Sequence, residues 1–545
     1  MNCNAGDGGL FYMRKNLFIY ITSFLCGMTV MGVELSATRL LAPYFGTSSI
    51  VYTVVIGLIM ISMSIGNVLG GRSADKHNDL GRLFSLLWIA ALWVAIIPLV
   101  GKYIIALVTV LMMYILPGNL LVSGSVISCL LVFSAPLLIL GMVSPYLVKL
   151  GVRNMENSGR TTGEIYAAST IGSIIGTFIP TFLTIPYIGT MKSFLVFALA
   201  LNLTCLYYFI TRKKGLVKSV ITTVLTAVLL LLPVQNPFAF WTNVVLEDES
   251  LYNYLQVTEN SDSVILSTNV AFGVQSIYKK NKTLSGLYYD YAVTSPLMLN
   301  DASAKKPADI LVLGMGTGTF AKECRYFFPE SRIDGVEIDQ KIVDLSKKYF
   351  GLRDDEAKIY INDGRTFLSS PDAGKYDIVL VDAYHDITIP FHMSTTEFFS
   401  QIKEHLKPGG IIMININMRS DKSTEVEDYL TQTLRTNMQK VYKFSVPNTT
   451  NVFVFSSDNA DMLSDFRNNA DQLDEKSPVK ALAQSIIDNC SEVTDTKYVF
   501  TDDLAPVEVL GQKALDDIVS QELAYFREEL RNSGNGVLDV FNMIS

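Results

Sequence analysis

Acidic side chains recur at the ends of predicted strands in the second half of the sequence. Glu337 ends the stretch DGVEID, Asp363 precedes Gly364 in YINDGRTFL, and Asp382 ends YDIVLVD. The carboxyl ends of parallel strands meet at one edge of a sheet, so these acids are expected to share a site. There Glu337 would bind ribose hydroxyls and Asp363 an adenine amino group. Asp382 would help to deprotonate an amine, whose free pKa of about 10 leaves it unreactive at pH 7.

A glycine-rich loop precedes these acids in LVLGMGTGTF, residues 311–320. Gly314, Gly316 and Gly318 allow the chain to pass close beneath a ligand, and the following helix offers free backbone N–H groups. No lysine follows the glycines as it does in a P-loop, which favours an adenosyl sulfonium over a nucleoside triphosphate. The alternative interpretation is that the loop and the acids are ordinary turn and capping residues.

The elements that must position these residues alternate between strand and helix. Predicted strands cover 309–313, 333–337, 358–361, 377–382 and 411–416, and predicted helices begin after Thr319 or cover 340–349 and 395–406. This alternation indicates an α/β fold with a mostly parallel sheet and helices on both faces. Near the C-terminus, residues 512–531 place apolar side chains on one helical face, which predicts a docking helix.

The first part of the chain has a different composition. Of 545 residues 49% are apolar and only 18% are charged, and from Leu83 to Val148 Lys102 is the only charged residue. Windows long enough to cross a bilayer lie at 16–33, 51–69, 83–100, 122–147, 165–184, 193–210 and 218–234, and the window 103–117 is ambiguous. The sequence therefore predicts a tail at 1–15 and a polytopic α-helical membrane domain of seven or eight spans at 16–234.

The basic loops and the expected chemistry give opposite orientations. Seven spans with a cytoplasmic N-terminus place every basic loop inside and the second half of the chain outside. Eight spans bring that half inside, as a cytosolic sulfonium nucleotide requires, and a final segment lying in the membrane interface would reconcile the two counts. We expect a multi-pass cell-membrane protein whose catalytic domain is cytoplasmic.

Charge and cysteine usage exclude several classes of partner. The formal net charge of -8 argues against a nucleic-acid partner, which would need a basic face. The six cysteines show no CxxC pair and the four histidines no HExxH spacing, so no disulfide framework and no metal site are expected.

Taken together, these motifs resemble the polyamine aminopropyltransferases, most closely the membrane-fused spermidine synthase-like proteins. The resemblance covers nearly the whole chain. In the first part it is carried by ELSATRLLAPYFGTS, GGRSAD, GMVSPYLVKL and GRTTGEIYAASTIGSIIGT. In the second it is carried by GVQSIY, GLYYDYA, VLGMGTGT, GVEIDQKIVDLSKKYFGL, DGRTFL, VDAY, IPFHMSTTEFF, LKPGGIIMINI and TDDLAPVE.

The resemblance implies a fold and an activity. A small β subdomain is expected at 245–300, a Rossmann-like domain of the class I methyltransferase type at 301–510, and a docking helix with a tail at 511–545. The implied reaction transfers an aminopropyl group from decarboxylated S-adenosylmethionine to an amine and releases methylthioadenosine. The expected partners are the lipid bilayer, a small-molecule amine and a second copy of the chain in a homodimer.

The resemblance also assigns residues. Asp382 matches the family's catalytic acid, Glu337 its ribose ligand and Asp363-Gly364 its adenine-side pair, whereas Gln275 and Tyr289 match positions that line the site. Further candidates for substrate binding are Asp290, His385, Asp386 and Asp503.

Two departures from the family pattern concern the substrates. Thr317 stands where soluble spermidine synthases carry an Asp that holds the donor's cationic amine, and His385 stands where they carry an acid, with Asp386 one place later. Two other functions therefore stay open: a methyltransferase that uses S-adenosylmethionine, and a non-catalytic polyamine-binding or transport protein. The acidic surroundings favour the aminopropyl donor, which lacks the carboxylate of the methyl donor.

Overall fold

The computed structural model describes residues 5–46, 49–77, 79–115, 120–152, 155–234, 238–239, 243–269, 273–304, 306–383, 389–417, 423–511 and 514. The chain forms two compact units, which we call the helical unit and the sheet unit. The helical unit comprises Met1–Phe240, Leu246–Tyr254 and Asn269–Ala271, and the sheet unit comprises Trp241–Val245, Leu255–Thr268 and Phe272–Ser545.

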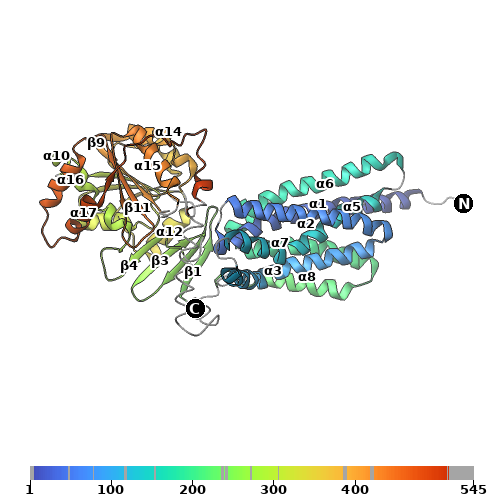
Figure 1. Ribbon diagram of the computed structural model, residues 1–545. Helices are drawn as coiled ribbons and strands as arrows, with labels where there is room; N and C mark the ends of the chain where they lie inside the picture. Colours follow the sequence, from blue (N-terminus) through green and yellow to red (C-terminus); the bar gives the residue numbers. More distant parts are fainter. Residues whose placement is uncertain are drawn as a thin grey trace. The chain divides into compact units, whose positions relative to one another are not determined.

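The helical unit is a bundle of long apolar helices (Figure 1). Its elements are α1 (Ala5–Phe45), α2 (Ser49–Lys76), α3 (Leu80–Ile115), α4 (Leu120–Val132), α5 (Ser134–Gly151), η2 (Met155–Asn157), α6 (Ser158–Phe178), η3 (Ile179–Thr184), α7 (Ile185–Arg212) and α8 (Leu216–Leu231). The predicted windows 83–100 and 103–117 form one helix, α3, whereas the window 122–147 is divided between α4 and α5.

Five helical segments of the described chain are long and apolar enough to cross a membrane: Leu17–Phe45, Ile50–Lys76, Leu80–Met112, Ser134–Gly151 and Ser158–Arg212. The expectation of seven or eight spans is therefore not confirmed by helix length. The difference arises because residues 158–212 form one helical run that contains two predicted windows and changes direction at Gly189, with φ 82°. In addition, the apolar helices Val122–Val132 and Leu216–Leu231 are shorter than a typical span.

Small residues bring α1 and α6 into direct backbone contact. A Cβ atom added at Gly172 would lie 2.0 Å from the carbonyl oxygen of Phe24, and one at Gly176 would lie 2.2 Å from that of Met28. Glycine is thus the only residue that permits this approach at either position. Small residues at such positions let membrane helices pack closely.

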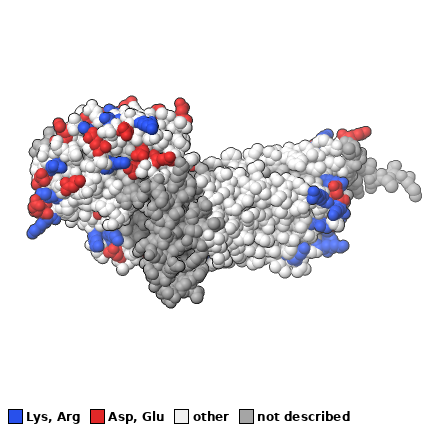
Figure 2. Space-filling model, in the orientation of Figure 1, with Lys and Arg blue, Asp and Glu red and all other residues white. Residues whose placement is uncertain are grey.

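Basic side chains gather at one end of the helical unit, while most of its visible length carries no charge (Figure 2). We call this end the basic end. Helix α1 begins at this end (Figure 1), and near its start Tyr20 donates a hydrogen bond to Glu164, which also accepts one from Arg160 at 2.8 Å. Further along α1, Arg39 donates to the carbonyl oxygen of Leu251 at 2.5 Å. The segment Leu246–Tyr254 therefore packs at the other end of the helical unit.

The sheet unit contains an eight-stranded sheet in the order β12-β10-β11-β9-β8-β5-β6-β7. Its strands are β5 (Asp309–Leu313), β6 (Arg332–Glu337), β7 (Lys358–Ile361), β8 (Tyr376–Val381), β9 (Leu406–Ile416), β10 (Lys440–Ser445), β11 (Val452–Ser457) and β12 (Ser491–Glu492). Strands β9, β8, β5, β6 and β7 are parallel to one another, as the sequence predicted, and the other three are antiparallel to their neighbours. A separate four-stranded sheet consists of β1 (Val244–Glu249), β2 (Tyr254–Glu259), β3 (Ser263–Thr268) and β4 (Ser276–Lys279).

Side chains of the central strands alternate between two hydrophobic cores. Ile310 and Val312 pack into one core and Leu311 and Leu313 into the other, because successive side chains of a strand point to opposite faces. Helices α11 (Thr319–Phe327), α16 (Met462–Asp471) and α17 (Pro478–Asn489) contribute to the first core, and α14 (Thr396–Glu404) and α15 (Glu425–Asn437) contribute to the second (Figure 1).

The remaining helices of the sheet unit are α9 (Tyr288–Ala292), η4 (Ser295–Met298), α10 (Asp301–Ala304), α12 (Gln340–Tyr349), α13 (Gly364–Leu368) and η5 (Phe391–Met393). The predicted docking helix at 512–531 lies, apart from Ala514, outside the described residues.

Candidate active site

The glycine loop and Asp382 meet where the order of the parallel strands reverses. From β5 the chain adds β6 and β7 on one side of the sheet and then β8 and β9 on the other. The loop after β5 and Asp382 after β8 are therefore neighbours at the carboxyl edge, where ligands of such sheets bind. Gly314 has φ 87°, and a Cβ atom there would lie 2.5 Å from the carbonyl oxygen of Asp382. This close approach requires glycine.

Two side chains hold the carboxylate of Asp382. Asn415 Nδ2 donates to one oxygen at 3.0 Å, and the hydroxyl of Tyr288 donates to the other. Asn415 is itself oriented by Asn451, which donates to its side-chain oxygen at 2.8 Å. Burial raises the pKa of Asp382 to about 7, although both hydrogen bonds favour the ionised form. The carboxylate thus has a fixed orientation and titrates near neutral pH.

Tyr289 and Gln275 lie beside this group. The rings of Tyr288 and Tyr289 have centroids 4.0 Å apart, and both residues are buried. The hydroxyl of Tyr289 donates to the backbone carbonyl of Gln275 at 2.8 Å. Burial raises the pKa of Tyr289, so its hydroxyl stays protonated. The structure therefore brings Gln275, Tyr289 and Asp382 together through Tyr288, a residue that the sequence analysis did not single out.

Glu337 ends β6 directly beneath the glycine loop. One of its carboxyl oxygens accepts the N–H of Gly316 at 2.9 Å, and the other accepts the N–H of Asp339 at 3.1 Å. Burial raises the pKa of Glu337 to about 7, although both backbone donors favour its ionised form. Each oxygen retains a second lone pair that a ligand hydroxyl could use.

Asp363 occupies the N-cap of α13. One carboxyl oxygen accepts the N–H of Thr366 at 2.8 Å, and the other lies 3.1 Å from Nε2 of His392. The hydrogen bond with His392 is the main reason that the pKa of Asp363 falls to about 2. The next residue, Gly364, packs tightly, because a Cβ atom there would lie 2.7 Å from Cε of Met393.

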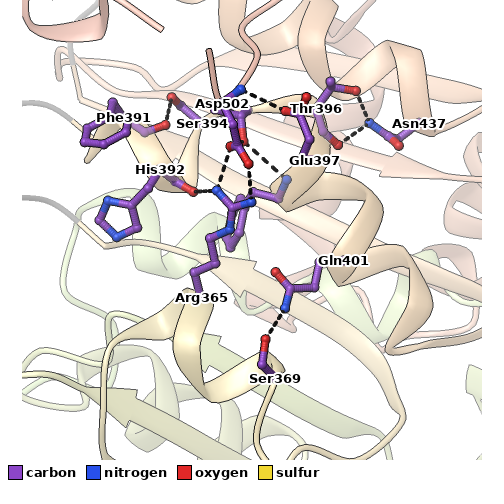
Figure 3. A network of polar contacts seen from close by, with 12 residues as sticks. Arg365, Ser369, Phe391, His392, Ser394, Thr396, Glu397, Gln401, Asn437 and Asp502 are labelled. Carbon is purple, nitrogen blue, oxygen red and sulfur yellow. Dashed lines mark hydrogen bonds and ion pairs between the residues drawn. The ribbon is translucent and has the colours of Figure 1, made fainter. Parts of the chain in front are cut away.

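A polar network anchors the chain next to α13 (Figure 3). Arg365 forms two parallel hydrogen bonds of 2.7 Å with Asp502 and a third of 2.9 Å with the carbonyl oxygen of His392. Thr395 also donates to Asp502 at 2.7 Å. Arg365 is the main reason that the pKa of Asp502 falls to about 2. Asp503, a predicted substrate ligand, is exposed immediately after this network.

Asp290 lies in a separate carboxyl pair. It accepts hydrogen bonds from the N–H and hydroxyl of Ser285, at 2.9 and 2.6 Å, and from the N–H of Gly286 at 3.0 Å. Glu323 accepts from the same Ser285 N–H at 3.0 Å, and burial raises its pKa well above the usual range. Both oxygens of Asp290 therefore hold the turn that precedes α9.

Two predicted site residues, His385 and Asp386, lie outside the described residues. Within the described ranges there is no group of three or more His, Cys, Asp or Glu residues that could hold a metal ion. The residues that sequence reasoning missed are Tyr288, His392, Arg365, Asn415 and Asn451. Only Asn415 gave a signal, as a polar residue inside the apolar run of β9.

Comparison with known proteins supports the resemblance. The spermine/spermidine synthase domain family matches residues 288–463, a range that includes Glu337, Asp363 and Asp382. A probable polyamine aminopropyl transferase from Bifidobacterium longum is 39% identical over 352 residues, which are 61% of this chain and 77% of that protein. A polyamine aminopropyltransferase from Vibrio vulnificus is 28% identical over 228 residues, 40% of this chain and 73% of that protein. Spermidine synthase from Thermotoga maritima, a solved structure, has 17% identity and a TM-score of 0.36 over 43% of this chain and 80% of that chain.

The Bifidobacterium relative combines substantial identity with coverage of most of its own length. The chain therefore belongs to the polyamine aminopropyltransferase family, whose donor is decarboxylated S-adenosylmethionine, and it is a transferase with a spermine/spermidine synthase domain.

Proposed function

We propose that this chain transfers an aminopropyl group from decarboxylated S-adenosylmethionine to a putrescine-like amine or another polyamine and releases methylthioadenosine. The observation that carries the proposal is the environment of the Asp382 carboxyl group together with its pKa. Its carboxylate is fixed by Tyr288 and Asn415 beside the glycine loop, and its pKa is about 7. A general base works best when its pKa lies near the working pH.

The chemical step follows from this geometry. An amine with a pKa of about 10 is protonated at pH 7 and has no lone pair for attack. Asp382 accepts a proton from it, and the freed nitrogen forms a bond to the propyl carbon attached to the sulfonium. The bond between that carbon and sulfur breaks, and its electron pair neutralises the sulfur as methylthioadenosine leaves. Asp382 thus acts as general base.

The other residues of the edge fit the donor nucleoside. Glu337 has a spare lone pair on each oxygen for the ribose hydroxyls, and its two backbone donors hold it in place. Asp363 and Gly364 would lie on the adenine side, at the start of α13. We assign Tyr289 and Gln275 to the wall nearest Asp382, because they contact Tyr288 or each other.

The charges of the site discriminate between the two donors. The methyl donor S-adenosylmethionine carries a carboxylate that needs a cationic partner, whereas the aminopropyl donor carries only cationic groups there. Arg365 is already committed to Asp502 and to a backbone carbonyl, and Glu337 and Asp382 repel a carboxylate when ionised. The opposing observation is Thr317, which supplies no charge in the glycine loop and which favours a methyltransferase.

The product decides between these two reactions. The purified full-length protein should be incubated with a set of amines and either donor, and the products should be weighed by mass spectrometry. We expect the mass gain of an aminopropyl group with the decarboxylated donor and no product with S-adenosylmethionine. A mass gain of one methyl group from S-adenosylmethionine would show that the protein is a methyltransferase. If no amine gave a product with either donor, the remaining function would be a non-catalytic polyamine-binding protein.

We further propose that the helical unit anchors the enzyme in the cell membrane as a multi-pass protein with the catalytic site on the cytoplasmic side. The donor's cytosolic origin supports that side. The basic loops of the helical unit support the opposite side, because seven spans that place these loops in the cytoplasm leave the second half of the chain outside. Replacing the exposed Asp461 by cysteine distinguishes the two sides of the membrane. It should react with an impermeant maleimide only after the cells are permeabilised, and labelling of intact cells would refute the cytoplasmic site.

A further inference from the structure

A cavity of about 900 Å³ opens at the basic end of the helical unit. Its walls come from the start of α3, the end of α5, the end of α7 and the start of α8. The charged residues that line it are Asp79, Lys149, Arg212, Lys214 and Lys218. None of them belongs to the candidate active site, so the proposed transferase reaction leaves this cavity without a role.

Positive charge dominates the lining of the cavity. It contains four cationic side chains but only one acidic side chain, that of Asp79, and one oxygen of Asp79 accepts the N–H of Gly81 at 2.9 Å. Within the part of the chain that the structure describes, only Lys149 of the four cations lies within ion-pair distance of a carboxylate, that of Asp75 at 2.9 Å. The cavity therefore offers unneutralised charge to an anion.

Uncharged neighbours hold one of these cations in place. The ammonium of Lys218 lies 4.4 Å from the centroid of the Trp88 ring and 5.2 Å from that of Phe209. The Trp88 ring is fixed in turn by a hydrogen bond of 3.0 Å from its N–H to the hydroxyl of Thr222. Aromatic contacts of this kind orient a cation without cancelling its charge.

Exposed apolar side chains adjoin the cations on both helices. Ile210 on α7 is 52% exposed two residues before Arg212, and Val217 on α8 is 73% exposed next to Lys218. A free phosphate would use the cations but not these apolar side chains. A phospholipid would use both, because its phosphate is anionic and its acyl chains are apolar.

We propose that this cavity binds the phosphate headgroup of an anionic phospholipid, whose acyl chains lie along the exposed apolar faces of α7 and α8. The headgroup would neutralise the cations that line the ends of α5, α7 and α8. Basic pockets between membrane helices have this chemistry. The bound lipid would fix the depth of the basic end in the bilayer, independently of the reaction in the sheet unit.

Lipid retention tests the proposal. The double variant Arg212→Gln/Lys214→Gln removes two cavity cations, and Arg72→Gln/Lys76→Gln removes two exposed cations of α2 that do not line the cavity. Mass spectrometry of the detergent-purified full chain should show preferential retention of phosphatidylglycerol over phosphatidylcholine. We expect the cavity variant to bind phosphatidylglycerol on the order of tenfold more weakly and the α2 variant to bind it like the wild type.

A charge-preserving variant and a salt titration complete the test. Arg212→Lys/Lys214→Arg preserves the charge and should preserve retention, and added salt should weaken phosphatidylglycerol binding to the wild type. These wild-type measurements still decide the matter if the cavity variant does not fold. Equal losses in the two Gln variants, equal retention of both lipids, or displacement of the lipid by inorganic phosphate would each overturn the proposal, the last in favour of a free-phosphate site.

Discussion

Replacing Asp382 by Asn is expected to lower the turnover number roughly 10²- to 10⁴-fold and to leave donor affinity nearly unchanged. The amide keeps the shape of the carboxyl group and can still accept from Tyr288 or Asn415, but it cannot take a proton from the amine. Release of methylthioadenosine at saturating donor and amine measures the turnover number. The loss should fall on turnover because the residues proposed to bind the donor nucleoside are unchanged in this variant.

The exposed Asp372 provides the matched control, because Asp372→Asn makes the same chemical change in the same unit and should leave turnover intact.

The pH dependence of wild-type turnover supplies a second check. A carboxyl group whose pKa is raised to about 7 is protonated and inactive below that pH and ionised above it, so wild-type turnover should fall about tenfold per pH unit below 7. If the Asp382→Asn variant turned over as fast as the wild type, Asp382 would not be the general base.

The second large effect is expected at Glu337. Glu337→Gln removes the negative charge that the N–H groups of Gly316 and Asp339 face, and it weakens the acceptors offered to the ribose hydroxyls. Hydrogen bonds to charged groups are worth about 1.5–3 kcal/mol, so donor affinity should fall on the order of 10- to 100-fold. Titration calorimetry should show a similar loss for methylthioadenosine, which has the same ribose, and a smaller change in turnover at saturating donor.

Asp334 lies on the same strand and serves as the control. Its carboxylate accepts the hydroxyl of Tyr376 at 2.9 Å, and Asp334→Asn should leave donor affinity near the wild-type value. If Glu337→Gln bound donor and methylthioadenosine like the wild type, the ribose would have to lie elsewhere, and the assignment of the glycine loop as the nucleoside site would fail with it.

The parallel core of the sheet was predictable because its signals are local. Strands β5 to β8 are short apolar runs bounded by turn residues, and helices α11 and α12 follow two of them directly. Strands β10, β11 and β12 were missed. They form an antiparallel extension in which β11 pairs with β9 although α15 and β10 lie between them in the sequence, and this pairing leaves no mark in the sequence of either strand.

The candidate site also combines positions that the sequence predicts with contacts that it does not predict. The positions of Glu337, Asp363 and Asp382 at strand ends follow from the local pattern. The contacts of Asp382 depend instead on which strands are neighbours. Asn415 reaches Asp382 because β9 lies beside β8, with Val381 opposite Ile414, and Tyr288 arrives from a helix that precedes the whole sheet.

Hydropathy windows located the apolar segments of the first half but not where each helix begins and ends. The ambiguous window 103–117 continues the preceding segment within α3, and residues 158–212 are one helical run broken only at Gly189. Mean hydropathy does not register a bend of this kind, which depends on the backbone conformation of one glycine.

We propose that the site prefers the aminopropyl donor although Thr317 stands where soluble spermidine synthases carry an acid in the glycine loop. The most direct measurement is titration calorimetry of the detergent-purified full-length protein with decarboxylated S-adenosylmethionine, S-adenosylmethionine and methylthioadenosine. We predict that the decarboxylated donor binds more tightly than S-adenosylmethionine, because Arg365 is already paired with Asp502 and because Glu337 and Asp382 repel the extra carboxylate when they are ionised. Tighter binding of S-adenosylmethionine would contradict the account and identify a methyltransferase, and failure of all three to bind would show that the site does not hold an adenosyl sulfonium.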